Sequence, residues 1–331
     1  MTHNFTVHDI ARMAGVSAMT VSRALNHPDQ VSPVTLEKVM VVVRSTGFVP
    51  NGMAGGLRSS KARLVAAVLP TLTGPVFQET IQALNQALDA RGYQLMVGQS
   101  GYDSAREDAL LDAIIRRRPD GIVLTGIMHS LAGRKQLLAS GIPVVETWDL
   151  TPTPIDMLVG FSNEDIGAAV CAYLHQRGYR RPALICGDDE RALRRNSGFQ
   201  RMARSLGETQ DAPLVLTSPP TTLGAGRSGL ADLLARPERI DAVFCSSDML
   251  ALGVLIEAQA RGMAVPGQLA IVGLGDLGFA ASLHPALTTV RIDGTRIGQT
   301  AAQYIVDRAD GRPIAEPIID IGFSIIERNT A

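Results

Sequence analysis

Cysteine is scarce in this sequence of 331 residues, and the three that occur, Cys171, Cys186 and Cys245, are scattered along the chain. Such spacing is typical of buried thiols in a reducing compartment and excludes a disulfide framework. The sequence also lacks a metal-binding motif and any uninterrupted apolar run of about eighteen residues. The N-terminus MTHNFTVHD has neither the basic start nor the apolar core of a signal peptide. We therefore expect a cytoplasmic protein without a membrane span, a metal or a cofactor.

Net charge is almost absent as well, because 31 basic and 32 acidic residues leave −1 at pH 7. The charge is unevenly divided: residues 1–63 hold seven Lys or Arg against three Asp or Glu and carry +4, which leaves −5 for the remainder. A small basic module on a larger acidic body is typical of a protein that meets phosphates with one end only. The chain is long enough to bury two or three cores.

Residues 6–25, TVHDIARMAGVSAMTVSRAL, predict two short helices around a glycine turn. Apolar residues recur at helical spacing, Gly15 supplies the turn and Ser17 caps the second helix. The second helix presents a face suited to a DNA major groove, formed by Ala18, Met19, Ser22 and Arg23. The pattern predicts a helix-turn-helix, with an ordinary helical hairpin as the alternative. A third helix is predicted from Ser32 and Pro33 to a stop at Gly47.

From residue 64 onward, apolar strands alternate with amphipathic helices, which predicts parallel sheets covered on both faces. The alternation runs twice, before and after the segment VGFSNED at 159–165. We therefore expect two similar α/β lobes joined by crossing strands. The closing segment EPIIDIGFSIIER, residues 316–328, is expected to form one strand.

The segments DIARMAGVSAMTVSRALN and GFVPNGMAGGLR, together with the rest of the chain, resemble the lactose/galactose-repressor (LacI/GalR) family of bacterial transcription regulators. The resemblance covers essentially the whole chain. It implies a helix-turn-helix DNA-binding headpiece at 1–48, a hinge helix or linker at 49–62 and a periplasmic-binding-protein-like domain for effector binding and dimerisation at 63–331. The N-lobe of that domain would comprise about 63–160 and 292–320, and the C-lobe about 161–291 with the C-terminal strand.

The resemblance implies a homodimer that places two headpieces on a palindromic operator. Base edges would be contacted by Ala18, Met19 and Arg23, and phosphates by Ser17, Thr20, Ser22 and Asn26. Because Ala18 and Met19 cannot form bidentate hydrogen bonds, we expect apolar readout there and hydrogen-bonded readout at Arg23. The family's hinge wedges a leucine into the minor groove, for which the matching position is Leu57, with Ala54 one turn earlier and Asn51 at the start.

The resemblance also places an effector between the lobes, at the carboxyl ends of strands. The candidate effector-binding residues are Phe77, Thr125, Glu146, Trp148, Asp149, Arg191, Arg195, Ser247, Asp248 and Asp276. Phe77 would pack on the ligand, and Arg195, with Arg191 one helical turn earlier, would clamp an anion. A helix cap is the alternative role of Asp248, and a place at the lobe interface is the alternative role of Trp148.

The sequence departs from many sugar- and purine-binding members at Gly275, where they carry Asp. The loss of a carboxylate beside an arginine-rich loop favours an anionic ligand. The segments VLPTLTGPVF, GIPVVETWD and VGFSNED also resemble gluconate-type repressors. We therefore expect a sugar acid, such as gluconate or a ketogluconate, to release the protein from its operator, with co-repression as the alternative.

Two other functions fit parts of the sequence. GLGDLG at 273–278 satisfies the G-x-G-x-x-G pattern of an NAD-dependent oxidoreductase, but barely one helical turn separates it from His284 and Pro285. GAGRSG at 224–229 repeats the pattern after a proline-rich segment, and no Ser/His/Asp set or paired carboxylates accompany either motif. An exported solute-binding protein shares the two-lobed fold but needs a signal peptide. We therefore expect no enzyme, and a dimer, because the C-terminus lacks a leucine-heptad tail.

Overall fold

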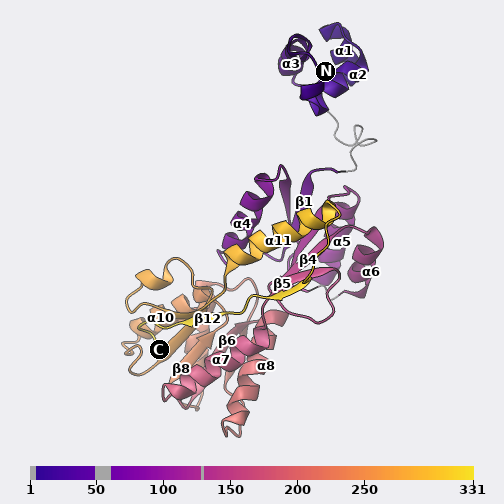
Figure 1. Cartoon of the computed structure of the whole chain (residues 1–331). Coiled ribbons are helices and arrows are strands. Elements are labelled where there is room, and N and C mark those ends of the chain that lie inside the picture. Colours follow the sequence, from indigo (N-terminus) through magenta and orange to yellow (C-terminus); the bar gives the residue numbers. More distant parts are fainter. Residues whose placement is uncertain (1–4, 49–60, 128–129) are drawn as a thin grey trace. The chain divides into compact units, whose positions relative to one another are not determined.

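The computed structural model describes residues 5–48, 61–127 and 130–331, and the chain divides into two compact units, Met1–Ala62 and Arg63–Ala331 (Figure 1). We call the described part of the first unit the headpiece and the second unit the body. Asn51, Ala54 and Leu57 of the predicted hinge lie outside the described residues.

The headpiece consists of three helices, as predicted: α1 (Val7–Ala14), α2 (Ala18–Asn26) and α3 (Pro33–Thr46), with a short 3-10 turn, η1 (Pro28–Gln30). Local hydrogen bonds set their boundaries. Gly15 ends α1 in the left-handed conformation with φ 66°, and the hydroxyl of Ser17 accepts from the amide of Thr20 at the start of α2. Ser32 caps α3 in the same way, as predicted. The small core contains Ile10, Ala11, Val21, Ala24 and Val39.

The N-lobe of the body is a six-stranded parallel sheet in the order β11-β5-β4-β3-β1-β2. Its strands are β1 (Leu64–Leu69), β2 (Gln94–Gln99), β3 (Gly121–Thr125), β4 (Val144–Thr147), β5 (Met157–Gly160) and β11 (Ile318–Asp320). Its helices are α4 (Gln78–Asp89), α5 (Ser104–Ile115), α6 (Leu131–Ser140) and α11 (Gly294–Ala309). Because parallel strands need crossover helices, the alternating pattern of the sequence produces this architecture.

The C-lobe has a second six-stranded sheet in the order β12-β10-β9-β8-β6-β7. Its strands are β6 (Pro182–Gly187), β7 (Leu214–Thr217), β8 (Ala242–Cys245), β9 (Ala270–Leu274), β10 (Thr288–Arg291) and β12 (Ser324–Ile326). The helices of this half are α7 (Asn163–Gln176), α8 (Glu190–Ser205), α9 (Leu223–Leu234), α10 (Asp248–Ala260) and the 3-10 turn η2 (Ala280–Ser282). Within this sheet β12 pairs antiparallel with β10, and the other pairs are parallel.

The prediction of one closing strand at 316–328 is wrong, because this segment forms β11 in the first sheet and β12 in the second. Gly322, with φ 66°, lies between them and lets the backbone turn where the chain passes from one lobe to the other. The chain also passes between the lobes from β5 to α7 and from β10 to α11. Three crossings therefore join the lobes.

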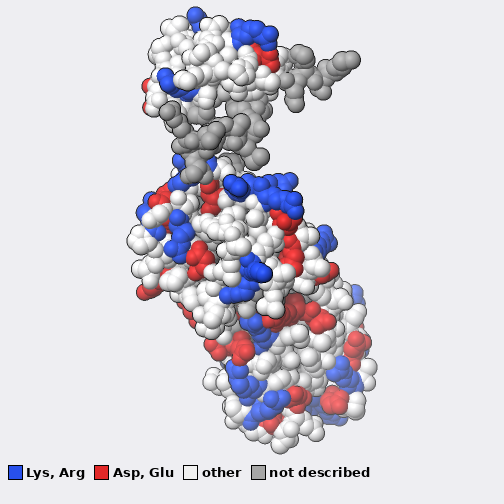
Figure 2. Space-filling view, turned by 90° about the vertical axis from the view of Figure 1, so that its right-hand side faces the viewer, with Lys and Arg blue, Asp and Glu red and all other residues white. Residues whose placement is uncertain are grey.

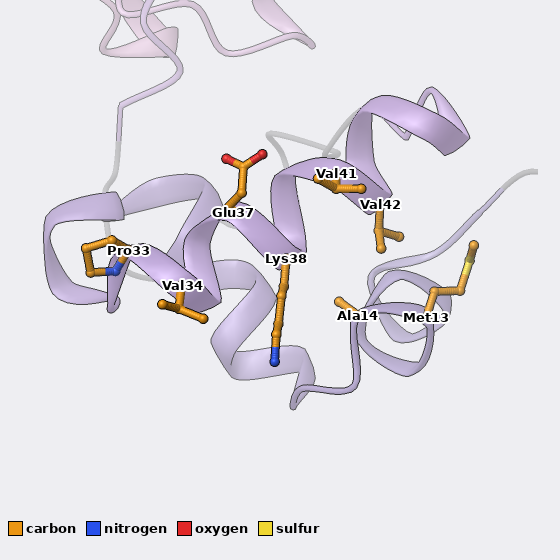
Figure 3. A pocket seen from close by; sticks show the side chains of 8 residues that line it. All are labelled: Met13, Ala14, Pro33, Val34, Glu37, Lys38, Val41 and Val42. Carbon is orange, nitrogen blue, oxygen red and sulfur yellow. The ribbon is translucent and has the colours of Figure 1, made fainter.

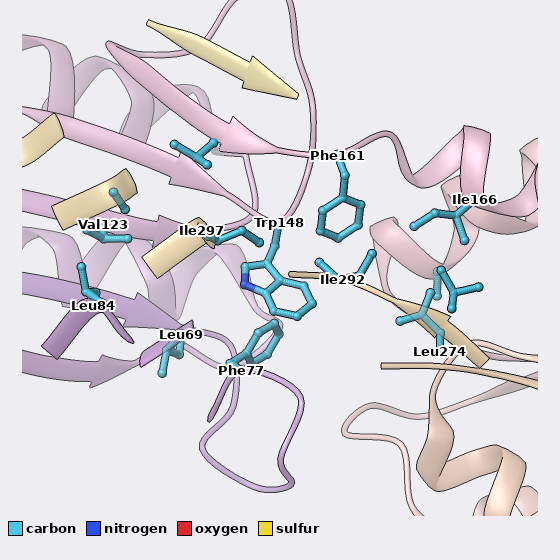
Figure 4. Close-up of a cluster of buried hydrophobic side chains, with 14 of the residues drawn as sticks. Leu69, Phe77, Leu84, Val123, Trp148, Phe161, Ile166, Leu274, Ile292 and Ile297 are labelled. Atoms are coloured by element: carbon cyan, nitrogen blue, oxygen red, sulfur yellow. The ribbon is translucent and has the colours of Figure 1, made fainter. Parts of the chain in front are cut away.

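A buried apolar cluster extends from one sheet to the other (Figure 4). Near its middle, the Trp148 ring contacts Phe77 edge to face at 4.9 Å between centroids and Phe161 at 5.7 Å. Edge-to-face pairs of this kind add about 0.5–1.5 kcal/mol to the free energy gained by burial. The cluster therefore holds the lobes together beside the carboxyl ends of their strands.

Candidate functional site

The exposed face of α2 carries the predicted DNA-contacting residues. Met19 is 70% exposed, and Ser22 and Arg23 are exposed on the same helix, whereas Val21 and Ala24 are buried in the headpiece core. Ala18 and Thr20 are partly buried, and the Thr20 hydroxyl lies 2.8 Å from that of the exposed Ser17. The side chain of Asn26 is not described. The exposed face of α2 therefore offers the apolar side chain of Met19 and the cationic side chain of Arg23 for contact with a binding partner.

The headpiece also has an apolar groove between α1 and α3 (Figure 3). It is lined by Met13, Ala14, Pro33, Val34, Glu37, Lys38, Val41 and Val42. None of these residues belongs to α2, so this groove is separate from the predicted DNA surface.

A cavity with about 70 Å³ of free volume lies in the body, at the carboxyl ends of strands from both lobes. This volume is smaller than the roughly 300–1,000 Å³ of typical small-molecule sites, and the polar and aromatic side chains that converge there mark the site. Five of the ten predicted effector residues line it: Phe77, Trp148, Arg191, Arg195 and Ser247. The other lining residues are Thr71, Thr73, Gly74, Val76, Tyr102, Phe161, Asp189, Pro220, Thr221, Ser246, Met249 and Leu274.

Arg195 is an almost fully buried cation on the wall of the cavity, with a residue exposure of 7%. Its Nη1 donates to Oδ1 of Asn163, and its Nε has no hydrogen-bond partner among the described residues. Burial lowers the pKa of Arg195, against the opposing effect of Asp189. A buried guanidinium with a free donor is suited to bind an anion.

Close helix packing positions Arg195. A Cβ atom on Gly167 of α7 would lie 1.8 Å from the carbonyl oxygen of Arg195, and one on Gly198 of α8 would lie 1.9 Å from that of Glu164. Only glycine allows this backbone approach. The two helices are therefore fixed against each other at the level of the cavity.

Arg191 lies one turn before Arg195 and contacts both lobes. Its guanidinium is 5.4 Å from the centroid of the Phe77 ring, and its Nη1 donates to the carbonyl of Thr125 at 3.5 Å. The Oδ1 atom of Asp189 is 3.8 Å from its Nε. Thr125 does not line the cavity, but its carbonyl oxygen accepts the hydrogen bond that holds Arg191 there.

Four predicted acidic residues are placed away from the cavity. Glu146 is fully buried and accepts from the amide of Ile155 at 2.7 Å. Asp149 is buried against Asn163, with Arg194 Nη1 3.3 Å from its Oδ2. The carboxylate of Asp276 accepts from Nη2 of Arg328 at 2.6 Å.

Asp248 is also buried, and the alternative role as a helix cap is wrong, because Ser247 caps α10 through the amide of Leu250. The carboxylate of Asp248 instead accepts from Thr289 Oγ1 at 2.6 Å and from the Leu277 amide at 2.8 Å. Burial raises the pKa of Asp248 to about 6, although both hydrogen bonds oppose the shift. This carboxylate joins α10 to the turn after β9.

Several polar residues of the cavity were not predicted from the sequence, among them Tyr102, Asp189 and Thr221. Tyr102 follows β2, and Asp189 follows β6, where it accepts from the amide of Ala192 as the cap of α8. The rule that ligands lie at the carboxyl ends of parallel strands indicates both positions. Thr221 lies in a proline-rich loop, and its hydroxyl is 2.8 Å from that of Ser247.

Neither glycine motif forms a dinucleotide site. GLGDLG is followed by the 3-10 turn η2 and not by a helix that could bind a pyrophosphate. GAGRSG lies inside α9, where Gly226 packs against the backbone of Leu250. Within the described ranges there is no group of three His, Cys, Asp or Glu placed to hold a metal, and no helix long and apolar enough to cross a membrane.

Comparison with known proteins agrees with this architecture. Residues 6–51 match the model of bacterial regulatory proteins of the lacI family, and residues 171–331 match a periplasmic binding protein-like domain. The HTH-type transcriptional regulator GntR of Pseudomonas aeruginosa is 33% identical over 98% of this chain and 95% of its own length. The regulator of the same name from Escherichia coli is 30% identical over 96% of each chain.

A solved structure of a LacI-family transcriptional regulator from Silicibacter pomeroyi superposes with a TM-score of 0.92 at 32% identity and covers 98% of this chain and 99% of its own. The fold is therefore that expected from the sequence. Since near full-length relatives share its sequence and its N-terminus matches the family model, this chain belongs to the LacI family of DNA-binding transcriptional regulators.

Proposed function

We propose that this regulator represses genes of carbohydrate catabolism and that a sugar acid, such as gluconate or a ketogluconate, releases it from its operator. The observation that carries the proposal is the buried guanidinium of Arg195, whose Nε lacks a partner on the wall of the cavity. A buried cation is unfavourable without an anion, and a carboxylate satisfies a guanidinium with two parallel hydrogen bonds. The side chain that accepts a hydrogen bond from Arg195, Asn163, is neutral, and the carboxylates of Asp189 and Asp149 act on the guanidinium without a hydrogen bond to it.

The rest of the cavity suits the hydroxyl groups of such a ligand. Thr71, Thr73, Thr221, Ser246 and Ser247 supply hydroxyls, and Asp189 supplies a carboxylate that accepts hydrogen bonds. Phe77 and Trp148 offer flat apolar surfaces to the carbon chain. The name GntR of two relatives is in keeping with the sequence resemblance to gluconate-type repressors.

A ligand in this cavity contacts both lobes and therefore favours one arrangement of them. In the proposed mechanism, a cytoplasmic homodimer binds a palindromic operator with two headpieces, and residues 49–62 form the hinge between headpiece and body. Asn51, Ala54 and Leu57 would contact the minor groove. Effector binding would change the arrangement of the lobes and weaken the paired DNA contacts.

Calorimetry with gluconate, 2-ketogluconate and glucose tests the effector class. The wild-type protein is expected to bind a sugar acid and not glucose. Arg195→Met is expected to weaken sugar-acid binding by about 10- to 150-fold, as for the loss of hydrogen bonds to a charged group. Arg201→Gln is the matched control, because Arg201 lies on the same helix but is exposed and pairs with Glu164. Tight binding of neutral hexoses alone would refute the proposal.

A mobility shift on the DNA upstream of the gene tests repression, at stated salt because phosphate contacts make affinity salt-dependent. The sugar acid that binds in calorimetry is expected to abolish the shifted complex. If it stabilises the complex instead, the protein is co-repressed and release is the wrong direction.

A further inference from the structure

The amino ends of the parallel N-lobe strands lie at one edge of the sheet, opposite the cavity. The three neighbours β2, β1 and β3 start there, and their first residues are joined through β1. The amide of Gln94 donates to the carbonyl of Arg63 at 2.8 Å, and the amide of Asp120 donates to that of Leu64 at 2.8 Å. The segments before these three strands are therefore side by side.

Each of the three segments carries exposed arginine, and we call the set the edge arginines: Arg63, Arg91, Arg116, Arg117 and Arg118. The acidic residues in the same segments are Asp89 and Asp120. The edge is thus basic, although the part of the chain that follows residue 63 is acidic overall. Figure 2 shows basic side chains gathered at the end of the body where the described chain resumes.

Most of the edge arginines donate hydrogen bonds to backbone carbonyl oxygens, which carry no net charge and so do not neutralise the guanidinium groups. Arg63 Nη1 donates to the carbonyl of Arg91 at 3.1 Å, and Arg117 Nη1 donates to that of Ala113 at 2.6 Å. Arg91 donates to the carbonyl of Ala87 at 3.0 Å. Arg116 differs, because it forms an ion pair with Asp112 at 2.6 Å, and its side chain is still 75% exposed. Positive charge is therefore available at this surface.

The position of this surface in the chain indicates its partner. The chain enters the body at this same edge, immediately before β1. Residues 49–60 connect it to the DNA-binding headpiece, and twelve residues span at most about 40 Å when fully extended. An exposed set of arginines joined to a DNA-binding unit by so short a connection meets a high local concentration of phosphates whenever that unit is bound.

We propose that the edge arginines contact phosphates of the duplex to which the headpiece is bound, independently of base sequence. These contacts add counterion release to the binding free energy and therefore steepen its dependence on salt. The body then contributes to DNA affinity directly, in addition to controlling the headpiece.

The test is fluorescence anisotropy of the full-length protein with a labelled random-sequence duplex of about 40 base pairs, at NaCl concentrations of about 50–200 mM. The double variant Arg117→Gln/Arg118→Gln is compared with Arg204→Gln/Arg239→Gln, which removes the same charge from exposed positions of the C-lobe. Each lost phosphate contact is expected to flatten the plot of log K against log salt by about 0.9, hence by about 2 per subunit for the edge double variant.

The C-lobe double variant is expected to keep the wild-type slope. Equal slopes for the two double variants would overturn the proposal, because the effect would then come from net charge or be absent. Arg117→Glu, a single change at an exposed position, provides a second measurement and must also flatten the slope. Thermal unfolding of each variant verifies that the body remains folded.

Discussion

The indole Nε1 of Trp148 donates a hydrogen bond to the hydroxyl of Thr80, 3.2 Å away in the buried interior of the body. Trp148 lines the cavity, whereas Thr80 belongs to α4 and lies behind it. A Cβ atom on Gly294, the first residue of α11, would be 3.0 Å from the same hydroxyl. This hydrogen bond therefore orients the Trp148 ring in the cavity and links it to the start of α11, where the chain passes from the C-lobe to the N-lobe.

Thr80→Val removes the acceptor of a buried indole N–H while preserving the shape of the side chain. We expect a loss of about 1–3 kcal/mol in the free energy of unfolding and weaker effector binding. Thr80→Ser keeps the hydroxyl and is expected to retain effector affinity. Trp148 is the single tryptophan of the chain, so intrinsic fluorescence follows both unfolding and effector titration at this position. Equal effector affinities for the two variants would contradict a positioning role.

Asp248 predicts a pH dependence of stability. Burial raises its pKa to about 6 in the folded protein, from the ordinary value of 3.8. A raised carboxyl pKa means that the folded state binds the proton more tightly. Protonation of Asp248 therefore stabilises the folded protein. This stabilisation is fully present below about pH 4 and is lost as the pH rises through 6. It amounts to about 3 kcal/mol at 1.36 kcal/mol per pKa unit.

Comparison with Asp248→Asn isolates this contribution from those of other carboxyl groups. The difference in the free energy of unfolding between wild type and variant, measured by urea denaturation from pH 4 to pH 8, is expected to shift in favour of the wild type as the pH falls. A difference independent of pH would show that Asp248 titrates normally.

Gly198→Ala is expected to destabilise the body by about 3 kcal/mol or more, because its Cβ would lie 1.9 Å from the backbone carbonyl oxygen of Glu164 and force α7 and α8 apart. Gly224→Ala in α9 is the control, since its Cβ would meet only Thr222 Oγ1, at 3.9 Å. That control should be neutral or gain up to about 1 kcal/mol from helix propensity. Thermal unfolding measures both, and similar melting temperatures would rule out a tight helix contact.

Arg23 and Met19 are expected to divide operator recognition on α2. Arg23→Ala should lower the preference for the upstream DNA over a random duplex by about 1–3 kcal/mol, the discrimination of one bidentate base contact. Met19→Ala should cost less, because it removes an apolar contact. Competition binding at fixed salt measures both preferences. If Met19→Ala lost the preference and Arg23→Ala kept it, the roles would be the reverse.

The sequence by itself determined the features that depend on neighbouring residues. Gly15, Ser17 and Ser32 define the headpiece helices because caps and turns are satisfied by backbone groups within three residues. The alternation of apolar strands and amphipathic helices predicted both sheets, because strands buried on both faces are apolar throughout and the helices that cover them have one apolar face. Strand ends also indicated the region of the cavity, with Phe77, Trp148, Arg191, Arg195 and Ser247 among its lining residues.

Only the tertiary structure decided which polar side chains at the strand ends reach the cavity. Glu146 and Trp148 are two residues apart, yet Glu146 is buried at Ile155 and Trp148, with φ 66°, lines the cavity. The partners that fix such orientations are distant in sequence: Thr80 is 68 residues from Trp148, and Thr289 is 41 residues from Asp248. The same holds for the closing segment, which divides between two sheets because each sheet has its own unpaired edge to fill. Local patterns specify elements, but long-range packing and hydrogen bonding specify where their side chains point.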